Sequence, residues 1–156
     1  MIASQLSIFA ENKPGKLAAV THVLAEEKIN IRATTISTSD TFGVINLIVD
    51  DPQKALEALT RAGILAKLRQ VLAIVIEDQP GALDKLAQLL VGAGVNVNNA
   101  YGFVLENQVK AVFVVDVDHL EKAEKIIEDN GFKTLGPEFL SVVEPSHGIK
   151  RQEVNK

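Results

Sequence analysis

Two short stretches of this sequence bring together residue types that can hold a charged small molecule. Residues 12–17 read NKPGKL, and residues 78–83 read DQPGAL, 66 positions later; we call them the first and the second cradle. In each, a Pro-Gly turn precedes an expected helix, whose free N–H groups favour an anion such as a carboxylate. The Asn12 carboxamide and the Asp78 carboxylate can accept hydrogen bonds from an ammonium group. One such stretch would be explained by a simple turn, but the repetition favours binding.

A second polar group follows each cradle at a constant spacing. Asn30 lies within Ile-Asn-Ile and Asn96 within Val-Asn-Val, each 18 residues after the first residue of its cradle. An asparagine side chain offers both a donor and an acceptor. Together with the helix-start N–H groups near Gly15 and Gly81, these amides suit the two opposite charges of a zwitterion. The sequence therefore predicts a free amino acid as the ligand.

The sequence offers little for catalysis or metal binding. The three histidines, His22, His119 and His147, do not share a metal-ligand spacing with carboxylates. Motifs for a serine nucleophile, a phosphate-binding loop or a dinucleotide are absent from the sequence. A small enzyme of the same fold would need a perturbed acid or base in a cleft, and we can nominate none. We expect a non-catalytic protein without a metal or cofactor.

The hydrophobic pattern around the cradles also repeats. In the first half, strands are expected at residues 3–10, 29–38, 44–49 and 64–69, with helices at 17–24 and 52–62. In the second half, strands are expected at residues 71–76, from 95, at 111–117 and within 138–143, with helices at 83–90 and 120–127.

Each half reads βαββαβ, the ferredoxin-like order. We predict an α+β fold of two such units, each an antiparallel sheet with its helices on one face. The units are expected at residues 1–70 and 71–144, without a linker between them, followed by a polar tail at 145–156.

The composition of the sequence indicates which partners and which compartment to expect. The net charge of −4 disfavours nucleic-acid binding, which needs clustered Lys and Arg. The sequence has no Cys, which excludes disulfides and thiolate metal sites and is compatible with a reducing compartment. The N-terminal residues do not resemble a signal peptide, and no apolar run is long enough to span a bilayer. We expect a cytoplasmic protein that binds neither nucleic acid nor membrane.

Two strands of the second half predict a further contact surface. Residues 72–76 and 111–115 are apolar at nearly every position. Helices cover only one face of the expected sheet, so an apolar second face needs another cover. We expect a homodimer formed through the helix-free face, mainly of the second unit. The alternative is that small residues such as Ala73 and Ala111 leave that face merely neutral.

The strand that leads into Asn-Lys-Pro-Gly-Lys-Leu, the following helix and the Ile-Asn-Ile strand start resemble the ACT domain, and Asp-Gln-Pro-Gly-Ala-Leu with Val-Asn-Val looks like a second copy. The resemblance covers residues 3 to about 144. ACT domains are regulatory modules that bind amino acids at interfaces between paired domains, often beside a metabolic enzyme. The resemblance thus implies a free-standing tandem ACT protein, a non-catalytic regulator that binds a free amino acid at the interface of its ACT-like domains.

In ACT domains the loop before the first helix and the start of the second strand contact the ligand, frequently from opposite domains. The resemblance carries ligand roles onto Asn12, Gly15, Leu17, Asn30, Ile31, Asp78, Gly81, Leu83, Asn96 and Val97. The first cradle has Asn where many members have Asp, so the two sites are expected to differ. An alternative is a module that has lost its ligand and acts by pairing with a metabolic enzyme.

Overall fold

The structure, a computed structural model, describes residues 1–106 and 109–138. The first unit has the expected βαββαβ order. Its elements are β1 (Ala3–Glu11), α1 (Lys16–Glu26), β2 (Ile31–Ser39), β3 (Phe42–Val49), α2 (Pro52–Arg61) and the first half of β4 (Ala66–Glu77). Helix α2 begins where the sequence predicts, because the Asp51 side chain accepts a hydrogen bond from the Lys54 N–H at 3.0 Å and Pro52 occupies the first turn.

The second unit repeats this order. It uses the second half of β4, then α3 (Ala82–Gly92), β5 (Val97–Glu106), β6 (Lys110–Val117), α4 (Leu120–Asp129) and β7 (Lys133–Leu135). The last strand was expected within residues 138–143 but comes directly after α4. Gly131, which has a left-handed backbone at φ 82°, terminates α4. Gly63, at φ 74°, has the same role after α2. Residues 139–143 and the expected polar tail lie outside the described residues.

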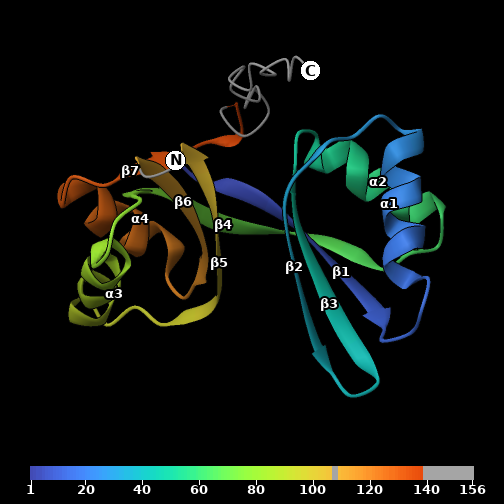
Figure 1. Ribbon diagram of the computed structural model, residues 1–156, viewed down its shortest axis with the longest axis horizontal. Coiled ribbons are helices and arrows are strands. Elements are labelled where there is room, and N and C mark those ends of the chain that lie inside the picture. The colour runs from blue at the N-terminus through green and yellow to red at the C-terminus, as the bar shows by residue number, and fades with distance from the viewer. Residues whose placement is uncertain (107–108, 139–156) are drawn as a thin grey trace, which may run out of the picture.

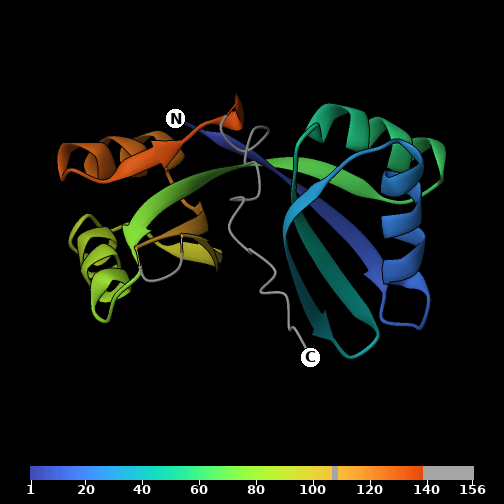
Figure 2. The ribbon, with the colours of Figure 1, turned by 45° about the horizontal axis from the view of Figure 1, so that its top comes forward.

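Strand β4 belongs to both units. Its residues 66–71 pair with β1, and residues 72–77 pair with β6, all in antiparallel register. The strands therefore follow one path, β2-β3-β1-β4-β6-β5, with β7 paired to β4. Figure 2 shows β4 running from one unit into the other. The boundary expected at residues 70 and 71 thus falls inside a single strand.

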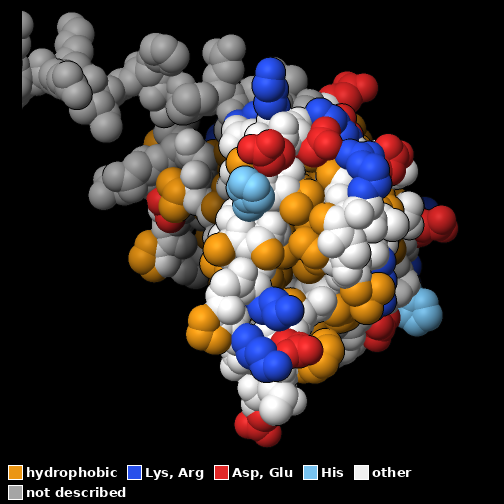
Figure 3. All heavy atoms as spheres, turned by 90° about the vertical axis from the view of Figure 1, so that its right-hand side faces the viewer, with side chains coloured by type: hydrophobic (Ala, Val, Ile, Leu, Met, Phe, Trp, Pro, Cys, Tyr) orange, Lys and Arg blue, Asp and Glu red, His pale blue; other side chains and the backbone are white. Residues whose placement is uncertain are grey.

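The helices lie on the two outer flanks of the molecule, and the sheets face inward (Figure 1). Under α1 and α2, Leu6, Leu24 and Leu59 are fully buried in the core of the first unit. Under α3 and α4, Leu72 and Ile127 are fully buried in the core of the second. Figure 3 views the flank of the first unit, where charged side chains of both signs surround hydrophobic ones.

The helix-free faces of the two sheets pack against each other, so neither needs a second chain to cover it. Ala73, Val112 and Val114 of the second unit are fully buried in a cluster that includes Ile48 of the first unit. The apolar face that was expected to require a partner is therefore covered within the same chain. A homodimer stays a prediction, but an uncovered apolar face no longer supports it.

Tyr101 ties the two facing sheets together. From β5 of the second unit, its hydroxyl donates a hydrogen bond to Gln5 Oε1 of the first unit at 2.9 Å. Burial raises the pKa of Tyr101 far above its ordinary value, so the hydroxyl keeps its proton and remains a donor. Gln5 is 1% exposed. If the tyrosine hydroxyl were removed, no water could replace it as the donor to the Gln5 oxygen.

We predict that Tyr101→Phe lowers the free energy of unfolding by about 1–3 kcal/mol, because a buried acceptor is left without this donor. Urea denaturation followed by circular dichroism measures the change. Tyr101→Leu is the companion variant, and its loss should be larger because the ring is removed as well. An unchanged stability of Tyr101→Phe would show that the hydrogen bond does not hold the units together.

The two end strands of the path, β2 and β5, contain the register shifts found in the described part of the sheet. One lies between Ile31 and Ala33 on β2. The others lie at 97/99 and 104/106 on β5. Such bulges bend a strand and interrupt its regular ladder.

Candidate functional site

Both cradles form left-handed turns at the start of a helix. Gly15 has φ 87° and ψ −12°, and Gly81 has φ 88° and ψ −13°. Glycine adopts this backbone at little cost, which explains the Pro-Gly pairs. Neither helix start has a side-chain cap, so first-turn N–H groups of α1 and α3 remain available for a ligand.

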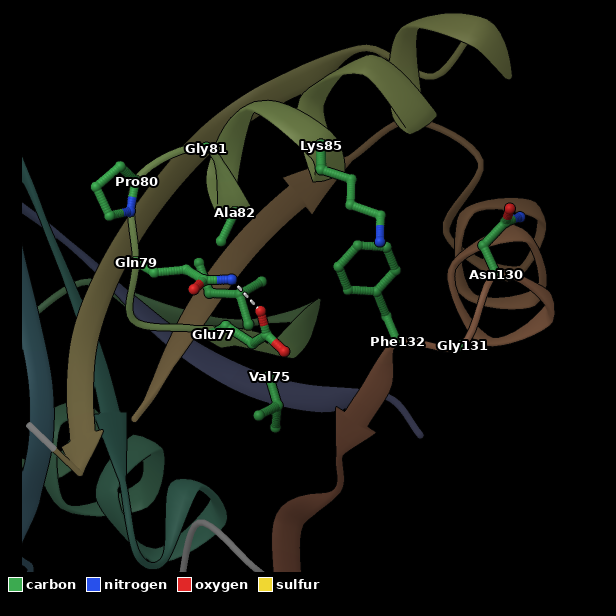
Figure 4. Close-up of a pocket in the computed structure, with 11 residues that line it drawn as sticks. Val75, Glu77, Gln79, Pro80, Gly81, Ala82, Lys85, Asn130, Gly131 and Phe132 are labelled. Carbon is green, nitrogen blue, oxygen red and sulfur yellow. Dashed lines mark hydrogen bonds between the residues drawn. The ribbon is translucent and has the colours of Figure 1, made fainter. Parts of the chain in front are cut away.

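The second cradle opens into a cavity of about 450 Å³. Gly81 lines it together with Glu77 from β4, Lys85 from the first turns of α3, and Phe132 from the loop before β7 (Figure 4). The Lys85 ammonium lies 5.9 Å from the centre of the Phe132 ring, close enough for a cation–π contact. The Glu77 carboxylate accepts a hydrogen bond from Gln79 Nε2. One wall of this cavity therefore has a cation and another an anion.

The first cradle has a related cavity of about 300 Å³ with different chemistry. Ala19 and Ile64 line it at the positions that correspond to Lys85 and Phe132. Lys16 and Glu11 supply the charges here, and the pKa of Glu11 is lowered by its hydrogen bond and ion pair with Lys13. The two cavities thus occupy repeated places but are lined by different side chains.

Within one unit, the cradle and the following asparagine lie at opposite ends of the sheet. The Asn12 N–H donates to the Thr41 carbonyl at 2.9 Å, beside the turn that ends β2, whereas Asn30, before β2 begins, accepts from the Asp50 N–H at 3.1 Å. Strand β2 has nine residues, a length of about 30 Å.

The second unit shows the same separation. Asp78 N–H donates to the Val109 carbonyl, and Asn96 accepts from the Asp118 N–H, both at 3.2 Å. The cradle and the strand start of one unit therefore do not form a shared wall.

The predicted ligand residues are distributed unevenly. Gly81 lines the second cavity. Asn12 uses its side-chain NH₂ to donate to the Asp40 carbonyl at 3.1 Å, and Leu17 and Leu83 lie on the surface, 43% and 45% exposed. The remaining predicted residues lie outside the linings of both cradle cavities: Gly15, Asn30, Ile31, Asp78, Asn96 and Val97.

Three side chains of the second cavity are not among the residues predicted from the sequence: Glu77, Lys85 and Phe132. Lys85 follows Gly81 by four positions, one helical turn, so helix periodicity could have placed it above the cradle. Phe132 could have been found from Gly131, which aligns with Gly63 in the repeat. Glu77 directly precedes Asp78, the carboxylate that was predicted to accept hydrogen bonds from the ammonium group of the ligand.

Residues 1–106 and 109–138 contain neither a metal-binding cluster nor a helix that could span a membrane. In this part of the chain no three His, Asp or Glu side chains lie close enough to hold a metal ion. The helices found there are too short or too polar to cross a membrane.

The family model of the ACT domain pair matches residues 1–142. Among solved structures, protein BT0572 from Bacteroides thetaiotaomicron is 35% identical, with 91% of this chain and 97% of that chain covered and a TM-score of 0.85.

More distant structures share the fold. The ligand-free regulatory subunit of aspartate kinase from Thermus thermophilus is 23% identical, with 84% of this chain and 97% of that chain covered and a TM-score of 0.59. The same subunit from Thermus flavus is 21% identical, with 82% and 95% covered and a TM-score of 0.53. The search of curated proteins gives no match. The repeated units, the paired cradles and the family match together show that this chain belongs to the ACT domain pair family.

Proposed function

We propose that this protein is a non-catalytic, cytoplasmic regulator that binds a free amino acid at its cradles. The observation that carries the proposal is the second cavity, in which Lys85 and Glu77 place opposite charges beside the open helix start at Gly81. An α-carboxylate is stabilised by the helix N-terminus and a cation, and an ammonium group by a carboxylate. The ligand class is therefore a zwitterion.

The second cradle is the stronger candidate of the two. Its cavity is larger, about 450 Å³ against about 300 Å³. It also contains an aromatic wall, Phe132, that can cover the apolar part of an amino acid. In the first cradle Glu11 is already paired with Lys13 at 2.5 Å, which competes with an incoming ammonium group. We expect tighter binding at the second cradle.

A second copy of the chain would complete the site in the way the family resemblance implies. The asparagines before β2 and β5 are too far from the cradles of their own units to contact the same ligand. A homodimer could bring the strand start of one copy to the cradle of the other, and ligand binding would then stabilise the dimer. Sedimentation velocity with and without the bound amino acid tests this part of the proposal.

A thermal-shift screen of the twenty amino acids tests the function itself. A ligand at 100 times its dissociation constant adds about 2.7 kcal/mol to stability, so a true ligand raises the melting temperature clearly. A flat screen at millimolar concentrations would contradict amino-acid binding. Capture of a metabolic enzyme that no amino acid affects would then favour the alternative, a pairing module without a ligand.

A further inference from the structure

A third cavity lies between the two units, away from both cradles. Its volume is about 330 Å³. We call it the interunit groove and define it by its lining: Gln5, Ser7, Phe9, Ser37, Val44, Asn46, Lys67 and Arg69 of the first unit, and Asn98, Asn99 and Asp116 of the second. The first unit supplies the helix-free face of its sheet, and the second closes the groove with the start of β5 and the end of β6.

Buried polar side chains form the floor of the interunit groove. Gln5, Ser7 and Asn46 are 1%, 2% and 6% exposed. Ser7 Oγ donates to Asn46 Oδ1 at 2.8 Å, and Gln5 Nε2 lies 3.1 Å from both Ser7 Oγ and Asn46 Oδ1. Burying three polar side chains is costly compared with an apolar packing of the same face, even when they bond to each other. Gln5 also accepts the hydrogen bond from Tyr101, so it has a structural role as well. Packing alone gives no such reason for the polar side chains of Ser7 and Asn46.

The internal repeat supports this conclusion, because the second unit shows what the same positions contain when only packing matters. The pair Ser7 and Asn46 between β1 and β3 corresponds to the pair Ala73 and Val114 between β4 and β6. Gln5, two residues before Ser7 on the same face, corresponds to Val71. All three counterparts are apolar and fully buried. An ACT unit can thus pack this face without polar groups.

A charge is also found where the repeat has an apolar residue. Lys67 pairs in register with Ser7, and its counterpart is Leu135, which pairs with Ala73 and is 2% exposed. Residues 67 and 69 lie on the same face of β4, so two cations line the interunit groove side by side.

Only part of this positive charge is neutralised by the groove's own side chains. Arg69 forms an ion pair with Asp116, the acidic residue of the lining. The Lys67 ammonium lies over the Phe9 ring, 5.1 Å from its centre, which holds the cation in place without neutralising it. The lining therefore has two cations and one anion, an excess of positive charge.

We propose that the interunit groove binds a small organic anion through a carboxylate. Lys67 and Arg69 would hold the carboxylate, and the amides of Asn46 and Asn99 would bind its polar remainder. A cavity of this volume lies at the lower end of small-molecule pockets, which limits the ligand to a few carbon atoms. This site is separate from the cradles and does not depend on amino-acid binding there.

Isothermal titration calorimetry of the full chain with succinate and with 2-oxoglutarate tests the proposal. We expect binding of at least one of them that weakens at high salt. Lys67→Gln should weaken binding about tenfold or more, because it removes a charge-assisted contact. Lys125→Gln is the matched control, since it removes the same charge from the exposed side of α4 and should leave the affinity unchanged. Equal losses in both variants would overturn a specific site.

A second variant tests the floor. We combine Gln5→Val, Ser7→Ala and Asn46→Val, which give the first unit the residues of the second, with Tyr101→Phe, which removes the hydroxyl that would otherwise lose its acceptor. The chain should fold, as circular dichroism checks, and bind the anion at least tenfold more weakly than Tyr101→Phe alone. Full affinity in this folded variant, or no affinity of the unaltered chain for either carboxylate, would overturn the proposal. Tighter binding of inorganic phosphate than of both carboxylates would overturn the assignment to carboxylates.

The groove and the cradles can be told apart. Anion binding at the interunit groove should survive Gly81→Asp, whereas amino-acid binding at the second cradle should survive Lys67→Gln. Loss of both ligands in either variant would contradict two independent sites.

Discussion

Replacing Leu72 with alanine is expected to destabilise both units together. Leu72 is fully buried in the core of the second unit, and truncation of such a leucine costs about 2–5 kcal/mol. Its neighbour Val71 pairs with Ala3 in the sheet of the first unit. Because β4 completes both sheets and the helix-free faces share a buried cluster, neither unit retains its packing when the other opens. We predict a single cooperative unfolding transition with its midpoint at a lower denaturant concentration.

The sole tyrosine offers a probe for this experiment. The chain has no Trp and one Tyr, so intrinsic fluorescence reports Tyr101 at the contact between the units, while circular dichroism reports both units. Urea curves from the two signals should coincide, with a lower midpoint in Leu72→Ala and an unchanged slope.

Val91→Ala is the matched control for this truncation. Val91 is 71% exposed on α3, so the change should stay within about 0.5 kcal/mol. Two separate transitions in Leu72→Ala would show that the units unfold independently in spite of β4.

Replacing Gly81 with aspartate is expected to abolish amino-acid binding at the second cradle. The new carboxylate would lie next to the helix N-terminus that is proposed to hold the carboxylate of the ligand, so the two anions repel each other. The loss of a charge-assisted contact with added repulsion is about 3 kcal/mol, a roughly hundredfold weaker affinity. A Cβ atom at position 81 would meet no atom within 4 Å beyond its chain neighbours, so the side chain has room, but the backbone at φ 88° is strained for any residue other than glycine.

Gly81→Asn separates charge from shape. Asn and Asp have nearly the same volume and meet similar strain from the left-handed backbone at φ 88°, so both variants should lose a similar amount of stability. Calorimetry with the amino acid found in the screen should show binding by Gly81→Asn that Gly81→Asp lacks. Equal affinities of the two variants would place the ligand elsewhere. Gly15→Asp then tests the first cradle in the same way.

Local patterns were sufficient to predict the element order. The alternation of Leu6 and Ile8 with polar neighbours, and the Pro-Gly turns at both cradles, indicate structure through contacts between residues close in sequence. The repeat then extends each assignment from one half to the other. The error at β7 arose where the repeat was not applied: Gly131 corresponds to Gly63 and places the strand directly after it.

The packing of the units and the lining of the sites could not be predicted in this way. The apolar pattern of β6 indicates that its second face is buried, but it cannot distinguish a second copy of the chain from the first unit of the same chain. Tyr101 and Gln5 meet across 96 positions of sequence, and no periodicity connects them. The same holds for Arg69 and Asp116, whose ion pair forms only because the continuous β4 turns one sheet toward the other.

The bulges on β2 and β5 have a consequence for behaviour at high concentration. An end strand with free N–H and C=O groups is a template on which another chain can extend the sheet, and a chain with one such strand at each end can extend it in both directions. Local kinks at Ile31, Val97 and Val104 make these templates irregular, which disfavours open-ended stacking into fibres.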